Sequence, residues 1–217
     1  ESGTRAVISL PGVPREMEYL LQHAILPYLQ QHYHIQGIIK ARVLHTAGAG
    51  ESQIDALVGD LEELTNPTVG LAAHSGQVDV RITVKADSAE AADELIKPVE
   101  KIIRERLGNW VYGADQESLE GIALKAVERN GWTLTVIESG LGGELIRRLA
   151  ALEGPFLGGQ VLTALPTPAE LLGLTEEYRN SHNADVGLGV AVHPAGEKQD
   201  VYFALITPDS TQQFMRP

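Results

Sequence analysis

Cysteine is absent from the sequence, basic residues are few, and no long hydrophobic run occurs. The absence of cysteine excludes disulfides, thiolate metal ligands and a cysteine nucleophile, and it fits a reducing compartment. Lys and Arg number 17 against 29 Asp and Glu, which gives a formal net charge of −12. A field of that sign repels phosphate backbones, so we expect no nucleic-acid partner. No apolar run reaches the roughly 18 residues that a membrane-spanning helix needs, so we expect no membrane partner.

The rest of the composition is typical of an ordinary folded protein. Hydrophobic residues make up 43% of the chain and charged residues 21%, which argues against disorder. A length of 217 residues allows one large domain or two small ones, and we expect more than one. The chain begins Glu1-Ser2-Gly3, with neither a Met nor a signal-peptide pattern. We therefore expect a piece of a longer, cytoplasmic protein.

The N-terminal region, residues 1–32, predicts one strand and one helix. Residues 5–10 have strand composition, two prolines interrupt the chain at Pro11 and Pro14, and residues 15–31 form an amphipathic pattern. One strand and one helix do not make a domain. This unit belongs to a domain whose earlier part is absent, or it packs on the next region of the chain.

Residues 33–113 predict a compact α+β domain of the split-βαβ kind. Strands are expected at residues 38–46, 68–73, 78–85 and 110–112, with helices at 51–64 and 88–107. In this order both helices pack on one face of an antiparallel sheet. Pro98 should kink the second helix without ending it. The predicted core faces of the two helices are Ile54, Leu57, Val58 and Leu61, and Ala92, Leu95, Val99 and Ile103.

Residues 114–217 predict an α/β sandwich. Helices are expected at 118–129 and 144–152, and strands at 133–137, 159–163, 186–192 and 201–206. A segment punctuated by prolines follows the second of these strands and runs to Leu174. The polar tail from Thr207 is expected to fray.

Ser139 lies where the strand at 133–137 breaks into a glycine-rich turn. Gly140, Gly142 and Gly143 would let backbone N–H groups converge on an anion or a developing oxyanion. A serine at that position could act as a nucleophile if a base and an orienting group lay beside it. The alternative is an ordinary strand-to-helix turn, for which glycines are equally suited.

No metal site or cofactor site is expected. The seven histidines are scattered along the chain, without a helical pair beside a carboxylate. They are His23, His32, His34, His45, His74, His182 and His193. The Gly-rich segment at residues 48–52 lacks the lysine of a phosphate-binding P-loop, so it predicts only a strand-to-helix turn.

Several of these stretches together resemble the CinA family of competence/damage-inducible proteins. Residues 10–17, which read LPGVPREM, are similar to a segment near the end of that family's molybdopterin-binding-like domain. Residues 48–52 and 66–70, with Arg81-Ile82-Thr83, are similar to motifs of its KH-like domain. The resemblance implies the end of a molybdopterin-binding-like domain at 1–32, a KH-like domain at 33–113, and a CinA C-terminal-like α/β sandwich at 114–217.

The C-terminal part resembles the family's nicotinamide mononucleotide deamidase domain. In that resemblance Ser139 falls on the nucleophile, and Gly142 and Gly143 fall on a glycine pair expected to bind substrate. Thr163 stands where the family has a tyrosine, and Pro168 where it has the lysine that completes the site. Proline has no ammonium group, so the expected base is missing.

The sequence also differs from the family's motifs at further positions. Gly140 and Leu141 replace the Cys-Thr pair after the serine, and residues 189–194 lack the hydroxyl and both glycines of the third motif. Lys198 is the nearest match to the lysine of the last motif, which implies a substrate-binding role. The stretch between Gly173 and Val186 is too short for the long helix that the family carries there.

Three hypotheses arise for the function. The first is a noncatalytic scaffold with a degenerate deamidase-like domain, homo-oligomer contacts and a vestigial pocket for a nucleotide-like small molecule. The second is an active deamidase that uses Ser139 with a relocated base, for which Lys125, His193 and Lys198 are the candidates. The third is nucleic-acid binding through the KH-like domain, which the net charge and the lack of a basic GxxG loop oppose.

Overall fold

The N-terminal part of the chain forms one interrupted helix in the computed structural model, which describes residues 6–33, 37–74, 76–195 and 198–216. Helix α1 (Pro14–Leu20) continues through a π-helical turn, η1 (Leu21–Ile25), into α2 (Leu26–Tyr33), as the periodicity predicts. The predicted strand at residues 5–10 is wrong over residues 6–10, which are irregular, and Arg5 lies outside the described residues. A strand needs a neighbour for its hydrogen bonds, and residues 6–10 pair with none in the described chain.

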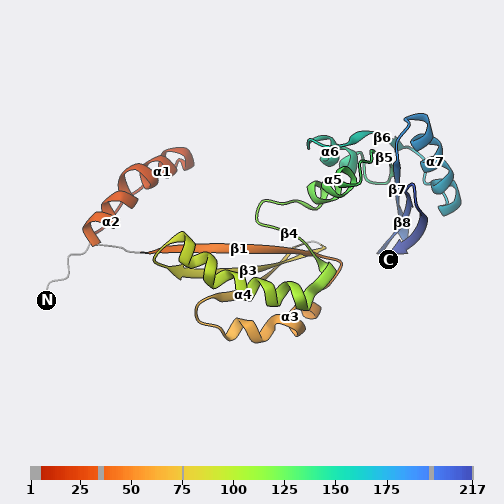
Figure 1. Cartoon of the computed structure of the whole chain (residues 1–217). Helices are drawn as coiled ribbons and strands as arrows, with labels where there is room; N and C mark the ends of the chain where they lie inside the picture. The colour runs from red at the N-terminus through yellow and green to blue at the C-terminus, as the bar shows by residue number, and fades with distance from the viewer. Residues whose placement is uncertain (1–5, 34–36, 75, 196–197, 217) are drawn as a thin grey trace. The chain divides into compact units, whose positions relative to one another are not determined.

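A four-stranded sheet comes next, with the order β2-β3-β1-β4. Its strands are β1 (Ile38–Ala47), β2 (Thr68–His74), β3 (Gln77–Ala86) and β4 (Val111–Ala114). The pairs β1/β3 and β2/β3 are antiparallel. Helix α3 (Glu51–Val58), a 3-10 turn η2 (Gly59–Glu63) and helix α4 (Ala89–Leu107) lie on one face (Figure 1), with a last 3-10 turn, η3 (Gly108–Trp110), before β4. This confirms the predicted α+β class.

The core of this unit lies between the sheet and its two helices. Alternating residues of β3 are buried there: Val78, Val80, Ile82 and Val84. Helix α4 is continuous through Pro98, which confirms that part of the prediction. The predicted core positions Leu57 and Leu95 are wrong, because each is 38% exposed. Ile96 and Leu107 are buried instead, since the apolar stripe of α4 follows Ala92, Ile96, Val99, Ile103 and Leu107.

The second unit contains a five-stranded mixed sheet in the order β6-β5-β7-β8-β9. Its strands are β5 (Leu134–Ser139), β6 (Phe156–Leu162), β7 (Val186–Ala195), β8 (Lys198–Ile206) and β9 (Thr211–Arg216). Strand β5 runs parallel to β6 and β7, whereas β7/β8 and β8/β9 are antiparallel. The chain divides into its two compact units between Val111 and Tyr112.

Helices cover both faces of this second sheet (Figure 1). Helices α5 (Leu119–Arg129) and α6 (Glu144–Ala150) pack on Leu134 and Val136 of β5. Helix α7 (Pro168–Ser181) packs on the other face, where Leu171 meets Ile137. Successive β5 side chains therefore point into two different cores, as alternation along a strand requires. A sheet covered on both faces confirms the predicted α/β class of this region.

The second unit has two elements that the sequence patterns do not predict, and the prediction of a fraying tail is wrong. The proline-containing segment to Leu174, for which the sequence patterns predict no helix, is largely helix α7, which has 14 residues and continues to Ser181. Pro168 occupies its first turn, and Thr167 and Glu170 form a capping box, so the proline begins the helix instead of preventing it. The polar tail forms strand β9, whose partner β8 supplies the hydrogen bonds that its sequence does not suggest.

Candidate functional site

Ser139 is the last residue of β5, the middle strand of the parallel part of the sheet. Its neighbours in register are Leu162 of β6 and Ala191 of β7. Its side chain is only 1% exposed, and its Oγ donates a hydrogen bond to the Ala164 carbonyl oxygen at 2.9 Å. The carboxyl ends of parallel strands are where α/β proteins usually bind ligands. Here, however, the hydroxyl proton is already engaged with a backbone acceptor.

The glycines after Ser139 are required by the path of the backbone. Gly140, Gly142 and Gly143 have φ angles of +78°, +64° and +88°, a region that side chains disfavour. At Gly140 a Cβ atom would also lie 2.6 Å from the Val192 carbonyl oxygen. Gly143 is the N-cap of α6, which has only seven residues. The turn geometry by itself accounts for these glycines.

Glu138 is a second polar residue at this turn, and the sequence motifs did not single it out. It is fully buried, and its Oε2 accepts a hydrogen bond from Ile146 N at 3.1 Å, near the start of α6. Its Oε1 has no hydrogen-bond partner among the described residues. Because strand side chains alternate, Glu138 lies on the α6 face and Ser139 on the α7 face. Glu138 therefore cannot serve as the base for Ser139. A charged residue in a continuous apolar strand was the signal that could have found it.

Among the candidate bases, His193 lies at the same end of the sheet as Ser139. It follows Ala191 by two residues in β7, and its Nε2 is 3.0 Å from the Pro166 carbonyl oxygen. Its ring packs edge-on against Tyr202, with centroids 4.9 Å apart. Ser139 and His193 thus both hold carbonyl groups of one loop, residues 163–167, between β6 and α7.

Within the part of the chain that the structure describes, no hydrogen bond or ion pair joins Ser139 to Lys125, Thr163 or Pro168. Lys125 lies on α5 and forms an ion pair with Glu117 at 3.4 Å. Lys198 begins β8, and its side chain lies outside what the structure describes. Thr163 is exposed just after β6, and Pro168 is the first residue of α7.

A groove of about 670 Å³ lies between the β6–α7 loop and one side of α7. Its lining includes Leu165, Pro166, Glu170, Leu174 and Glu177, but neither Ser139 nor His193. These two residues contact the loop that forms one wall, at the carbonyls of Ala164 and Pro166.

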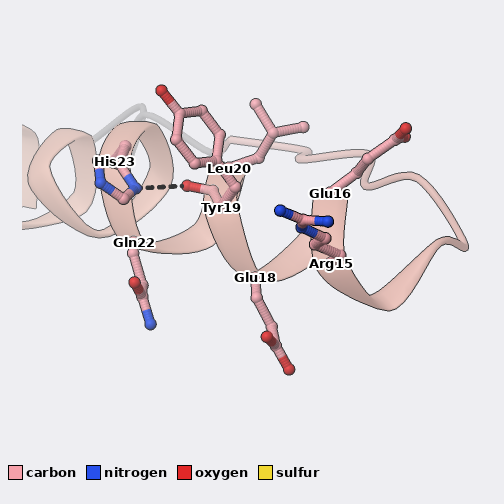
Figure 2. Close-up of a pocket in the computed structure, with 7 residues that line it drawn as sticks. All are labelled: Arg15, Glu16, Glu18, Tyr19, Leu20, Gln22 and His23. Atoms are coloured by element: carbon pink, nitrogen blue, oxygen red, sulfur yellow. Dashed lines mark hydrogen bonds between the residues drawn. The ribbon is translucent and has the colours of Figure 1, made fainter.

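A second hollow, of about 700 Å³, follows the exposed side of α1 and η1. Figure 2 shows its lining, in which His23 Nδ1 lies 3.0 Å from the Tyr19 carbonyl oxygen and the two rings stack. All of its lining residues come from residues 15–23 of one helix. A hollow with a single wall supports no assignment of a binding site.

Histidines and carboxylates form one small cluster in the first unit. Asp79 of β3 contacts His45 Nδ1 at 2.7 Å and His74 Nε2 at 3.2 Å. Within residues 6–33, 37–74, 76–195 and 198–216, no three His, Asp or Glu side chains are grouped so that they could hold a metal ion. In the same described ranges no helix is long and apolar enough to cross a membrane.

The fold and motifs define a protein with a KH-like domain, and comparisons with known proteins identify the family. The family described as "Damage-inducible protein CinA KH domain" matches residues 41–113. A CinA-like protein of Parasynechococcus marenigrum is 35% identical over 196 residues, 89% of this chain and 47% of the relative. A putative competence-damage inducible protein of Moorella thermoacetica is 39% identical over 178 residues, 81% of this chain and 43% of the relative. The chain belongs to the CinA family, and it spans about half the length of these curated relatives.

Among solved structures, a competence or damage-inducible protein from Enterobacter asburiae is similar to this chain. The similarity covers 46% of this chain and 84% of that protein, with 20% sequence identity and a TM-score of 0.36.

Proposed function

We propose that this chain is a CinA-like protein whose C-terminal domain, residues 114–217, is a noncatalytic scaffold related to nicotinamide mononucleotide deamidases. The proposal includes a KH-like domain at residues 33–113 and the end of a molybdopterin-binding-like domain at 1–32. The observation that carries it is the state of Ser139. Its hydroxyl is buried and donates to the Ala164 carbonyl oxygen, an acceptor that cannot take up its proton.

The surroundings of Ser139 support the same proposal. Amide hydrolysis by serine needs a base for the hydroxyl proton and donors for the tetrahedral oxyanion, and losing one such member costs several orders of magnitude in rate. Thr163 and Pro168 occupy the positions that the family resemblance gives to tyrosine and lysine. Glu138 lies on the opposite face of the strand and is no substitute.

An ammonia-release assay with nicotinamide mononucleotide tests this proposal. The parent chain and the Ser139→Ala variant should both release no ammonia above a protein-free blank. Ser139→Ala should also lower the free energy of unfolding by about 1 kcal/mol, because the Ala164 carbonyl loses a buried donor. Robust release by the parent that Ser139→Ala abolishes would overturn the noncatalytic proposal.

The second candidate function is an active deamidase with His193 as a relocated base. It is favoured by the position of His193, two residues beyond the β7 neighbour of Ser139. Its Nε2 would have to leave the Pro166 carbonyl before it could accept the serine proton. If the parent does release ammonia, comparing His193→Gln with Lys125→Gln identifies which of the two side chains is required.

We further propose that the scaffold acts as a homo-oligomer in the cytoplasm and retains a site for a nucleotide-like small molecule. Sedimentation velocity of the purified chain tests the first part. A single monomeric species at all micromolar concentrations would contradict it.

A further inference from the structure

The groove beside α7 has two walls of different origin. One wall is a stripe along α7, formed by Glu170, Gly173, Leu174 and Glu177, which lie at helical spacing on one face. The other wall is the β6–α7 loop, represented by Leu165 and its neighbours. Two walls from separate elements make a groove of about 670 Å³, within the usual range for ligand-binding clefts.

The loop wall is held in place from behind. Ser139 Oγ donates to the Ala164 carbonyl, and His193 Nε2 lies within hydrogen-bond distance of the Pro166 carbonyl. Gln213 Nε2 of β9 donates to the Pro168 carbonyl at 2.8 Å, just after the loop. A groove whose walls are already ordered loses little conformational entropy when it binds a partner. Ser139 and His193 are therefore positioning residues for this wall.

The groove combines apolar and acidic surface. Leu165 and Leu174 are 48% and 38% exposed, so both offer apolar surface in the groove. Glu170 and Glu177 add two carboxylates, and Thr167 lowers the pKa of Glu170 through hydrogen bonds from its backbone N–H and its hydroxyl. No lining residue is basic. Gly173 leaves a notch in the helix wall, because a Cβ atom there would meet nothing within 4 Å.

We infer that this groove binds a basic, leucine-containing peptide segment of another protein. Apolar side chains of such a segment fit against Leu165 and Leu174 and into the notch at Gly173, while its cations pair with Glu170 and Glu177. The chain's net charge of −12 favours the approach of a basic segment over an acidic one. The inference rests on the proposed function, in which the β6–α7 loop has no catalytic role.

The test is a binding titration with a fluorescein-labelled synthetic peptide in which leucine and arginine alternate. Fluorescence anisotropy should show saturable binding that weakens as salt increases. A peptide with glutamate in place of arginine should not bind. Gly173→Leu should abolish binding by filling the notch, and it should not disturb the fold, since leucine is a good helix former and Gly173 does not need a positive φ.

Two neighbouring glutamates provide a matched control. Glu177→Lys, inside the groove, should weaken binding by roughly tenfold, whereas Glu176→Lys should change it by roughly twofold or less, because both alter net charge equally but only Glu177 lines the groove. Equal effects of the two variants, or binding that survives Gly173→Leu, would mean diffuse attraction to an acidic surface and would overturn the inference.

A second copy of the chain is the other conceivable occupant of the groove. Sedimentation velocity separates the two: a parent dimer that Gly173→Leu converts to monomer, without peptide binding, would refute the peptide partner. The ammonia-release assay has an independent readout. Ammonia release together with peptide binding would refute only the noncatalytic proposal, and absence of both would refute only the peptide inference.

Discussion

At the scale of single residues, the end of β5 shows how alternation separates two polar side chains that are adjacent in sequence. Glu138 stabilises the start of α6 on one face of the sheet, and Ser139 holds the β6–α7 loop on the other. Both are buried, and each has a structural hydrogen bond. The glycines that come after them adopt the positive φ angles that the turn requires.

Gly140 and Gly142 should differ in their tolerance of alanine. Gly140→Ala should lower the free energy of unfolding by about 3 kcal/mol or more, since it adds a clash with the Val192 carbonyl to the cost of a positive φ. Gly142→Ala should cost only about 1–2 kcal/mol, because its Cβ would lie in open space. Urea denaturation of both variants measures the difference. Equal losses would show that the clash relaxes.

Asp185 should make stability depend on pH in the acid range. Hydrogen bonds from the Thr133 hydroxyl and backbone N–H, both 2.9 Å long, lower the pKa of Asp185 in the folded state. A lowered folded pKa stabilises the protein above the unfolded pKa, and this contribution is lost as pH falls through the folded pKa. Stability should thus fall more between about pH 6 and about pH 3 in the parent than in Asp185→Asn.

Urea midpoints at both pH values measure this difference. Asp209→Asn, in the turn between β8 and β9, is the control, because the Asp209 side chain has no hydrogen bond in the part of the chain that the structure describes. The same pH dependence in Asp185→Asn as in the parent would contradict the role of this carboxylate at the start of β5 and β7.

At the scale of elements, helix α7 has two roles in the second unit. It closes one face of the sheet through Leu171, and its exposed side forms one wall of the groove. Its start depends on a capping box, in which Glu170 Oε2 accepts from the backbone N and the hydroxyl of Thr167 at 2.8 Å each.

Thr167→Ala should therefore lower the free energy of unfolding by about 1 kcal/mol, because the first turn of α7 loses its side-chain cap. Thr163→Ala, an exposed change in the same loop, should stay within about 0.5 kcal/mol of the parent. Thermal or urea denaturation gives both values. If Thr167→Ala proved neutral, the cap would be contributing nothing and Pro168 by itself would start the helix.

At the scale of the whole molecule, the chain consists of two compact units that meet in sequence at Val111 and Tyr112. Each unit has its own buried residues. The first unit buries Leu44, Ile82 and Ile103. The second has one cluster around Val136 and another around Ile137 and Leu171. Separate cores are the physical basis for separate folding domains.

Matched isoleucine substitutions should separate the two units. Ile103→Ala and Ile137→Ala each remove a buried side chain and should each cost about 2–5 kcal/mol in the unit that contains it. Hydrogen exchange read by peptide should accelerate in residues 37–111 for the first variant and in residues 112–216 for the second. Acceleration of both units by either variant would show that they unfold together.

Much of the architecture follows from local patterns in the sequence. The alternation in β3 and the helical period of α4 are short-range properties, and the structure confirms the strand and the helix that they predict. Likewise, the motifs of residues 48–52 and 66–70 were sufficient to indicate the family. These features depend on residues a few positions apart, so they can be read without knowing which surface packs against them.

Tertiary structure decided what depends on distant partners. Strand β9 exists because β8 pairs with it, and residues 6–10, which have strand composition, form no strand because no described strand lies beside them. The helical period predicts burial of Leu57 and Leu95 wrongly, since burial depends on the facing surface as well as on the period. The role of Ser139 was equally undecidable from its motif, because a hydroxyl's chemistry depends on its acceptor. That acceptor, the Ala164 carbonyl, is 25 positions away in sequence and is brought close only by the parallel pairing of β5 and β6.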